Sequence, residues 1–176
     1  MLFSKKKTYQ AHSTFSDKRD SKVILGIDPG LATTGFGIIN NDRGKLSLID
    51  YGCITTKAGV PRAQRLKQIS EELTKLIIKQ KPKVIAVEQL FFYNNAKTAF
   101  AVGEARGVVI LTACQNRLPI YEYTPLQVKQ AVSAYGKASK LQVQRMVKLL
   151  LNLKEIPKPD DAADALAVAI CCANSI

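Results

Sequence analysis

Three short apolar runs joined by very short connections constrain the fold of this chain more than any other feature. VILGID (23–28), FGIIN (36–40) and KLSLIDYGCI (45–54) each have the pattern of a β-strand, and the turns GLATTG (30–35) and NDRG (41–44) separate them. Such short connections favour antiparallel neighbours, because parallel strands need a long crossover. The first third of the chain therefore predicts three antiparallel strands.

The remainder of the chain alternates between helical and strand patterns. RAQRLKQISEELTKLIIKQ (62–80) places apolar residues at helical spacing, and VIAVE (84–88) is nearly all apolar, as in a central parallel strand. A small-residue-rich helix (96–116), a fifth strand (118–124) and helices over 125–135, 139–151 and 160–173 follow. This order predicts an α/β fold: a five-stranded mixed sheet, three antiparallel strands followed by parallel additions, flanked by helices on both faces.

The chain divides into a leader (1–22) and a single folded domain (23–176). The leader is polar, basic and without periodicity, so we expect it to be disordered. It lacks the apolar core of a signal peptide, and Asp17 and Asp20 argue against an organellar transit peptide.

The charge of the chain indicates a polyanionic partner. The formal net charge is +12, and without the first 22 residues 20 basic residues still face 12 acidic ones. A basic domain of this kind favours nucleic acid over an anionic membrane as the partner.

The inventory of histidines and cysteines excludes several kinds of active site. The only histidine, His12, lies in the leader, so the domain has no His-based triad and no His-ligated metal. None of the four cysteines belongs to a CxxC pair, and all have apolar neighbours, so we expect buried thiols in a reducing compartment.

Two carboxylates end predicted strands. Asp28 closes the first strand and Glu88 closes the fourth. If these strands are neighbours in the sheet, both side chains leave it at the same edge, where ligands of such sheets bind.

Two further carboxylates lie at the start of the last predicted helix. The i, i+3 spacing of Asp161 and Asp164 places both on one helical face. Asp160 follows Pro159 and is the expected N-cap. A purely structural role remains open, because acids in a first turn complement the helix dipole. Equally, Asp28 alone suits a turn and Glu88 alone suits a salt bridge.

Taken together, the four carboxylates predict a metal centre. Four such groups repel one another unless cations neutralise them, and oxygen ligands without histidine or cysteine suit Mg²⁺ or Mn²⁺. Two such ions support in-line phosphoryl displacement. A basic surface around an acidic metal centre is the pattern expected of a nuclease.

Six segments give the chain a family resemblance. They are LGIDPGLATTGFGII, AVEQLFFYNNAKTAF, GEARGVVI, YTPLQVKQAV, KLQVQRMV and DDAADALAVAI, in order between Val23 and Ala173. In these segments the chain resembles the bacterial RuvC family of Holliday-junction resolvases, within the ribonuclease H-like superfamily. The segment before Val23 is additional to that resemblance.

The resemblance implies an activity and its partners. It implies a homodimeric endodeoxyribonuclease of the bacterial cytoplasm that acts in recombination and DNA repair. Paired nicks in opposite strands of a four-way junction, at a T-rich sequence, would leave 5′-phosphate and 3′-hydroxyl ends. Two Mg²⁺ ions are expected per active site, with Mn²⁺ as a substitute. A junction-binding protein and a branch-migration motor, RuvA and RuvB, are the expected protein partners.

The resemblance also assigns roles to individual residues. It makes the four carboxylates metal ligands, Lys140 an active-site lysine near the scissile phosphate, and Lys129 a second functional lysine. Phe91 would stack on an unpaired base. The expected catalytic and metal-binding acids are Asp28, Glu88, Asp161 and Asp164, and the expected DNA-binding residues are Phe91, Asn95, Lys97, Thr98, Lys129 and Lys140.

Other roles stay open for several of these residues. The lysines also suit solvated helix faces, and Asn95, Lys97 and Thr98 suit either phosphate contacts or a helix cap. Phe92 suits the core or a dimer interface better than DNA.

Three other functions are compatible with parts of the sequence. An RNA-processing nuclease of the same superfamily would use the same acids. GIDPGLATTG resembles the phosphate-binding hairpin of actin-like ATP-binding proteins, although those need two lobes. A non-catalytic junction binder would not require all four acids.

Overall fold

The computed structural model describes residues 21–89 and 96–176, and the side chains of residues 96–98 are outside that description. The expected disordered leader lies almost wholly outside the described residues. The strands are β1 (Lys22–Asp28), β2 (Thr33–Asp42), β3 (Lys45–Thr55), β4 (Val84–Glu88) and β5 (Ile120–Tyr123).

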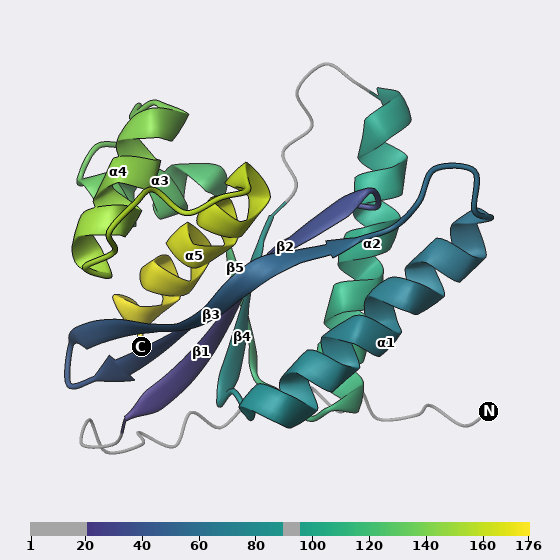
Figure 1. Cartoon of the computed structure of the whole chain (residues 1–176), viewed down its shortest axis with the longest axis horizontal. Helices are drawn as coiled ribbons and strands as arrows, with labels where there is room; N and C mark the ends of the chain where they lie inside the picture. Colours follow the sequence, from purple (N-terminus) through teal and green to yellow (C-terminus); the bar gives the residue numbers. More distant parts are fainter. Residues whose placement is uncertain (1–20, 90–95) are drawn as a thin grey trace, which may run out of the picture.

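These strands form one sheet in the order β3-β2-β1-β4-β5 (Figure 1). β1 pairs antiparallel with β2, and β2 pairs antiparallel with β3. β4 joins β1 in parallel, and β5 joins β4 in parallel. The predicted five-stranded mixed sheet is confirmed.

Helices cover both faces of this sheet, as predicted. On one face lie α1 (Arg62–Gln80) and α2 (Ala96–Gln115), and on the other lie α3 (Pro125–Ser133), α4 (Lys140–Leu150) and α5 (Asp160–Ala173) (Figure 1). Each face has its own apolar core. Ile27, Ile69 and Val109 belong to the first, whereas Ile24 and Leu166 belong to the second.

Helix α5 lies unusually close to the sheet because glycines face it. A side chain at Gly26 would collide with the backbone of Ala165, and one at Gly35 with the backbone of Asp161. Glycine is required at these points because any Cβ would force the helix away. The close approach places the first turn of α5 against the ends of β1 and β2.

Three details of the sequence prediction are wrong. β2 begins at Thr33 inside the predicted turn, because Thr33 pairs with Thr55 of β3. Asp160 is the first residue of α5 and does not cap it, since Pro159 holds the N-cap position. Cys114 is exposed on α2 and Cys53 is only half-buried, whereas Cys171 and Cys172 are buried as expected.

Among residues 21–89 and 96–176, no helix combines the length and apolar character needed to cross a bilayer.

Candidate active site

The sheet brings Asp28 and Glu88 to one edge. β1 and β4 are parallel neighbours, and Ile27 pairs with Val87 immediately before the two acids. Asp28 and Glu88 therefore leave the sheet side by side, as predicted from the strand order.

Helix α5 brings its first-turn acids to the same edge. The burial of Asp28 raises the pKa of its carboxyl to about 8, and the nearby Glu88, Asp164 and Asp161 carboxylates raise it further, against the opposing Lys140 ammonium. Residues from three separate elements thus act electrostatically on one buried carboxyl group. A like-charge cluster of this kind is common at functional sites.

Glu88 is subject to the same influences. Burial raises the pKa of Glu88 to about 7, and Asp164 adds to the rise while Lys129 and Lys140 oppose it. Burial also raises the pKa of Asp164, against a hydrogen bond from Lys140. The two lysines thus partly neutralise a negatively charged, poorly solvated site.

Lys140 contacts the acidic cluster directly. Its Nζ lies 2.8 Å from Oδ2 of Asp164 and 3.6 Å from Oδ2 of Asp160. Burial lowers the pKa of Lys140, but the hydrogen bond to Asp164 and the charges of Asp164, Asp160 and Asp161 together outweigh it, so the pKa of this lysine is raised. Sequence reasoning missed the contact with Asp160, whose other oxygen lies 3.0 Å from Nζ of Lys158.

Capping boxes fix the helices that carry the two lysines. Ser139 accepts a hydrogen bond from the backbone N–H of Gln142 and so fixes the start of α4 at Lys140. Thr124 makes the same arrangement with Gln127 at the start of α3, one turn before Lys129. Lys140 is therefore the first residue of a capped helix, and Lys129 lies one turn inside another.

A pocket of about 230 Å³ opens between these helices and the sheet edge. Charged residues of both signs line it together with apolar side chains. The lining residues are Glu88, Pro125, Val128, Lys129, Lys140, Val143, Asp164 and Ala167. The structure thus gathers Glu88, Asp164 and both predicted lysines around one pocket.

The oxygen atoms of the four acids are suitable ligands for a hard divalent cation. All four acids offer carboxylate oxygens, and their mutual repulsion favours a cation between them. Within residues 21–89 and 96–176, however, no three His, Cys, Asp or Glu side chains already form a group that would hold a metal. The assignment of the four acids as metal ligands stays a prediction.

Several predicted DNA-binding residues cannot be placed. Phe91 and Asn95 lie outside the described residues, as do Phe92 and Tyr93. Lys97 and Thr98 belong to the first turn of α2, but their side chains are not described.

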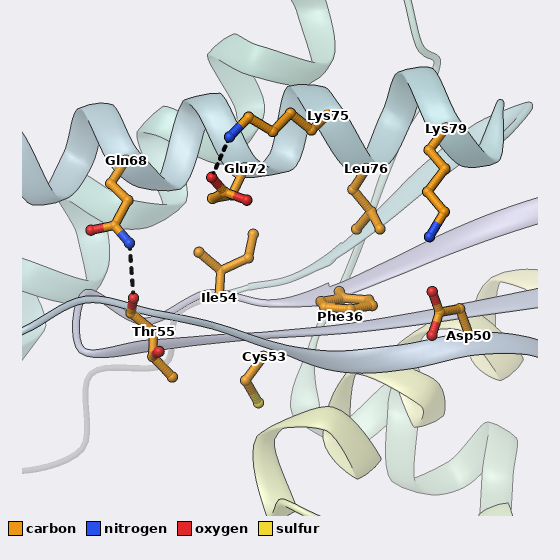
Figure 2. A pocket seen from close by; sticks show the side chains of 10 residues that line it. All are labelled: Phe36, Asp50, Cys53, Ile54, Thr55, Gln68, Glu72, Lys75, Leu76 and Lys79. Atoms are coloured by element: carbon orange, nitrogen blue, oxygen red, sulfur yellow. Dashed lines mark hydrogen bonds and ion pairs between the residues drawn. The ribbon is translucent and has the colours of Figure 1, made fainter.

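A second, larger cavity lies apart from the four acids. This groove of about 450 Å³ runs between β3 and α1 (Figure 2). Two of its polar side chains bind each other, Lys75 and Glu72 at 2.7 Å, and Gln68 donates to the backbone carbonyl of Thr55. Because its lining includes none of the predicted catalytic residues, we do not assign the reaction to it.

Comparison with known proteins identifies relatives over nearly the whole domain. Residues 24–172 match the family model described as crossover junction endodeoxyribonuclease RuvC. The RuvC protein of Halothermothrix orenii is 58% identical over 153 residues, covering 87% of this chain and 93% of that protein. The RuvC protein of Caldicellulosiruptor saccharolyticus is 57% identical over 149 residues, covering 84% and 90%.

Solved structures of RuvC have the same fold. Thermus thermophilus RuvC is 36% identical, with a TM-score of 0.80 over 86% of this chain and 93% of that chain. The same protein in complex with a Holliday junction substrate gives a TM-score of 0.81, over 85% and 92%. The ribonuclease H-like fold is thereby confirmed. With family model, sequence relatives and fold in agreement, this chain belongs to the crossover junction endodeoxyribonuclease RuvC family.

Proposed function

We propose that this chain is a structure-selective endodeoxyribonuclease that resolves Holliday junctions by nicking two opposing strands. The observation that carries the proposal is the set of acids at one sheet edge, with Lys140 in contact with Asp164, in a member of the RuvC family. A solved structure has its relative, Thermus thermophilus RuvC, in complex with a Holliday junction substrate.

Membership of this family implies dependence on a divalent metal. Mg²⁺ is the ion we propose, with Mn²⁺ as a substitute, because the ligands are hard carboxylate oxygens. Asp28, Glu88, Asp161 and Asp164 would hold two ions. Bound there, the ions would activate the attacking water and stabilise the leaving 3′-oxygen.

The protein's own groups prepare this reaction in two ways. Asp28 and Glu88 are half-buried at the end of the sheet, and this partial desolvation raises the pKa of both carboxyls and so favours a bound cation beside them. Lys140, fixed at the start of α4, offsets the negative charge that develops on the phosphate. Lys129, which lines the same pocket, would bind a neighbouring phosphate.

The segment after Glu88 would bind the junction and distort it. Phe91 would stack on an unpaired base, a contact of roughly 1–3 kcal/mol. Asn95, Lys97 and Thr98 would bind phosphates nearby. The short spacing from Glu88 would then couple distortion of the junction to placement of the scissile phosphate.

Paired nicking requires two active sites, and an apolar stripe on α2 provides a surface for a homodimer. Phe100 is 77% exposed and Leu111 56% exposed, with the exposed Gly107 and Cys114 on the same helical face. Gly107 has no heavy atom near the position of a Cβ, so a second helix has room to approach. A two-fold dimer through this stripe would present one active site to each of two symmetric strands.

The proposed setting of the reaction follows from the family. The enzyme would act in the bacterial cytoplasm in recombination and DNA repair. RuvA, which binds junctions, and RuvB, which drives branch migration, would be its partners. The clustering of Lys129, Lys140 and Lys158 near the acids supports an anionic substrate.

The test is a comparison of four labelled substrates: a four-way DNA junction, a linear duplex, an RNA–DNA hybrid and a structured RNA. We expect junction cleavage in Mg²⁺, no cleavage in EDTA, and nicks in opposite strands that DNA ligase seals. Faster cleavage of structured RNA would favour the RNA-processing alternative. Tight junction binding without cleavage in Mg²⁺ or Mn²⁺ would mean a non-catalytic binder.

A further inference from the structure

The turn that follows Asp28 is held by hydrogen bonds on three consecutive carbonyl groups. The donors come from β2 and from the residue that follows β3. Thr34 Oγ1 donates to Gly30 O at 2.7 Å, Thr56 Oγ1 to Leu31 O at 2.6 Å, and Thr56 N to Ala32 O at 3.0 Å. The carbonyl groups of Gly30, Leu31 and Ala32 thus all have partners within the protein.

Thr56 connects this turn to helix α1. Its side chain is buried, with 8% of the residue exposed, and its hydroxyl accepts a hydrogen bond from Nε of Arg65 at 2.7 Å. A hydroxyl has a single proton, so the Arg65 N–H directs that proton toward the carbonyl of Leu31. Because the guanidinium is charged, it also strengthens the bond it makes to the hydroxyl.

A second side chain of α1 forms a hydrogen bond at the end of β3, beside Thr56. Gln68 lies one turn after Arg65 and donates to the carbonyl of Thr55 at 3.1 Å (Figure 2). Thr55 pairs with Thr33, and Gly35 pairs with Asp28, so the end of β3 lies at the sheet edge that carries the acids. Hydrogen bonds from Arg65 and Gln68 therefore connect the beginning of α1 to the sheet edge at which Asp28 lies.

The position of Asp28 needs such support because its neighbours are like-charged carboxylates. Pro29 contributes no backbone donor that could anchor the turn. We propose that Arg65, acting through Thr56, is a positioning residue that holds the turn after Asp28 and so keeps this carboxylate within the metal-binding set. The inference rests on the proposed function for the identity of that set.

The first experiment measures metal affinity without any DNA. Free Mn²⁺ is counted by its aqueous EPR signal in titrations of the full chain and its variants. Thr56→Val, which keeps the shape but removes the hydroxyl, and Arg65→Gln should weaken Mn²⁺ binding by about tenfold. Thr56→Ser should restore most of the affinity. Arg62→Gln removes a charge from the same turn of α1, where Arg62 pairs with Glu104 on the surface, and should change nothing.

The second experiment separates positioning from direct DNA contact. Junction affinity in EDTA, and its dependence on salt, should be the same for Arg65→Gln and Arg62→Gln. A selective loss of affinity and salt dependence in Arg65→Gln, with Mn²⁺ binding intact, would make Arg65 a phosphate contact and overturn the inference. Mn²⁺ binding by Thr56→Val equal to that of the parent would overturn it as well.

The inference can still be tested if one variant folds poorly. If Arg65→Gln unfolds at the assay temperature, the comparison of Thr56→Val with Thr56→Ser still decides. If the parent binds Mn²⁺ but cuts no junction, the proposed function fails while the Mn²⁺ comparison still tests the Arg65–Thr56 contact.

Discussion

Asp28 shows most clearly what one residue contributes to this site. Its position was predictable, because an acid that ends a central strand must lie at the sheet edge. Its electrostatic state was not predictable, because the raised pKa depends on burial and on acids brought from β4 and α5. Those acids are distant from Asp28 in the chain, on a separate strand and on the last helix, and no local pattern encodes their approach.

Asp28→Asn should stabilise the metal-free protein, and the gain should depend on pH. The carboxyl titrates near pH 8 in the folded chain and near 3.8 in its ordinary state, so the folded form binds the proton more tightly. Stability is therefore lost as pH rises through this window. We expect Asn to gain about 1–3 kcal/mol near pH 8, roughly 2–4 °C in Tm per kcal/mol, and little below pH 4.

Thermal unfolding in EDTA across this pH range checks the expectation. A variant that melts below the parent at pH 8, or by the same margin at every pH, would contradict the proposed repulsion at Asp28.

Lys140→Gln should slow cleavage by about 10²-fold at saturating metal, since it removes the cation beside Asp164 that we propose to offset charge on the scissile phosphate. Single-turnover rates on a labelled junction measure the effect. Lys148→Gln, which removes a charge from the last turn of the same helix, is the matched control and should cleave normally. Equal rates for the two variants would remove Lys140 from the mechanism.

At the scale of elements, the bounds of several helices and strands were predictable from the sequence. The close packing of α5 against the sheet was not. α1 spans Arg62–Gln80 and β4 spans Val84–Glu88, as their apolar patterns indicated. The start of β2 was missed because its pairing with β3 overrides the turn-like sequence GLATTG. The exposure of Cys114 was missed because an apolar helix face can serve an interface as well as a core.

The contact between α5 and the sheet is the element-scale feature on which the site depends. Gly35→Ala would place a methyl group against the backbone of Asp161, which cannot yield without moving the first turn of α5. We expect a loss of about 1–3 kcal/mol and a larger loss of cleavage than that destabilisation explains.

Gly52→Ala is the control for this substitution. The atoms nearest to its Cβ would be those of the Phe36 ring, a side chain that can shift without moving the backbone. Chemical denaturation and junction cleavage are measured on both variants. If Gly35→Ala is as stable and active as Gly52→Ala, the close approach of α5 is not what places Asp161.

At the scale of the whole molecule, the proposed paired cleavage requires the proposed dimer. If the α2 stripe forms its interface, Phe100→Glu should give a monomer in sedimentation at low micromolar concentration, because it places a charge in this apolar surface. Nicks in the two strands should then become uncoupled. Leu149→Glu alters a similarly exposed apolar residue on α4 and should remain dimeric. A dimeric Phe100→Glu variant would place the interface elsewhere.

The most direct test of the metal-centre assignment compares binding and cutting in one variant. Asp28→Asn and the parent chain are incubated with a labelled four-way junction, in EDTA for affinity and in Mg²⁺ for cleavage. We predict unchanged or tighter binding by the variant and no detectable cleavage, because the substitution removes a carboxylate ligand but no positive charge. Cleavage by Asp28→Asn at the parent rate would contradict the assignment of the acidic cluster as the catalytic centre.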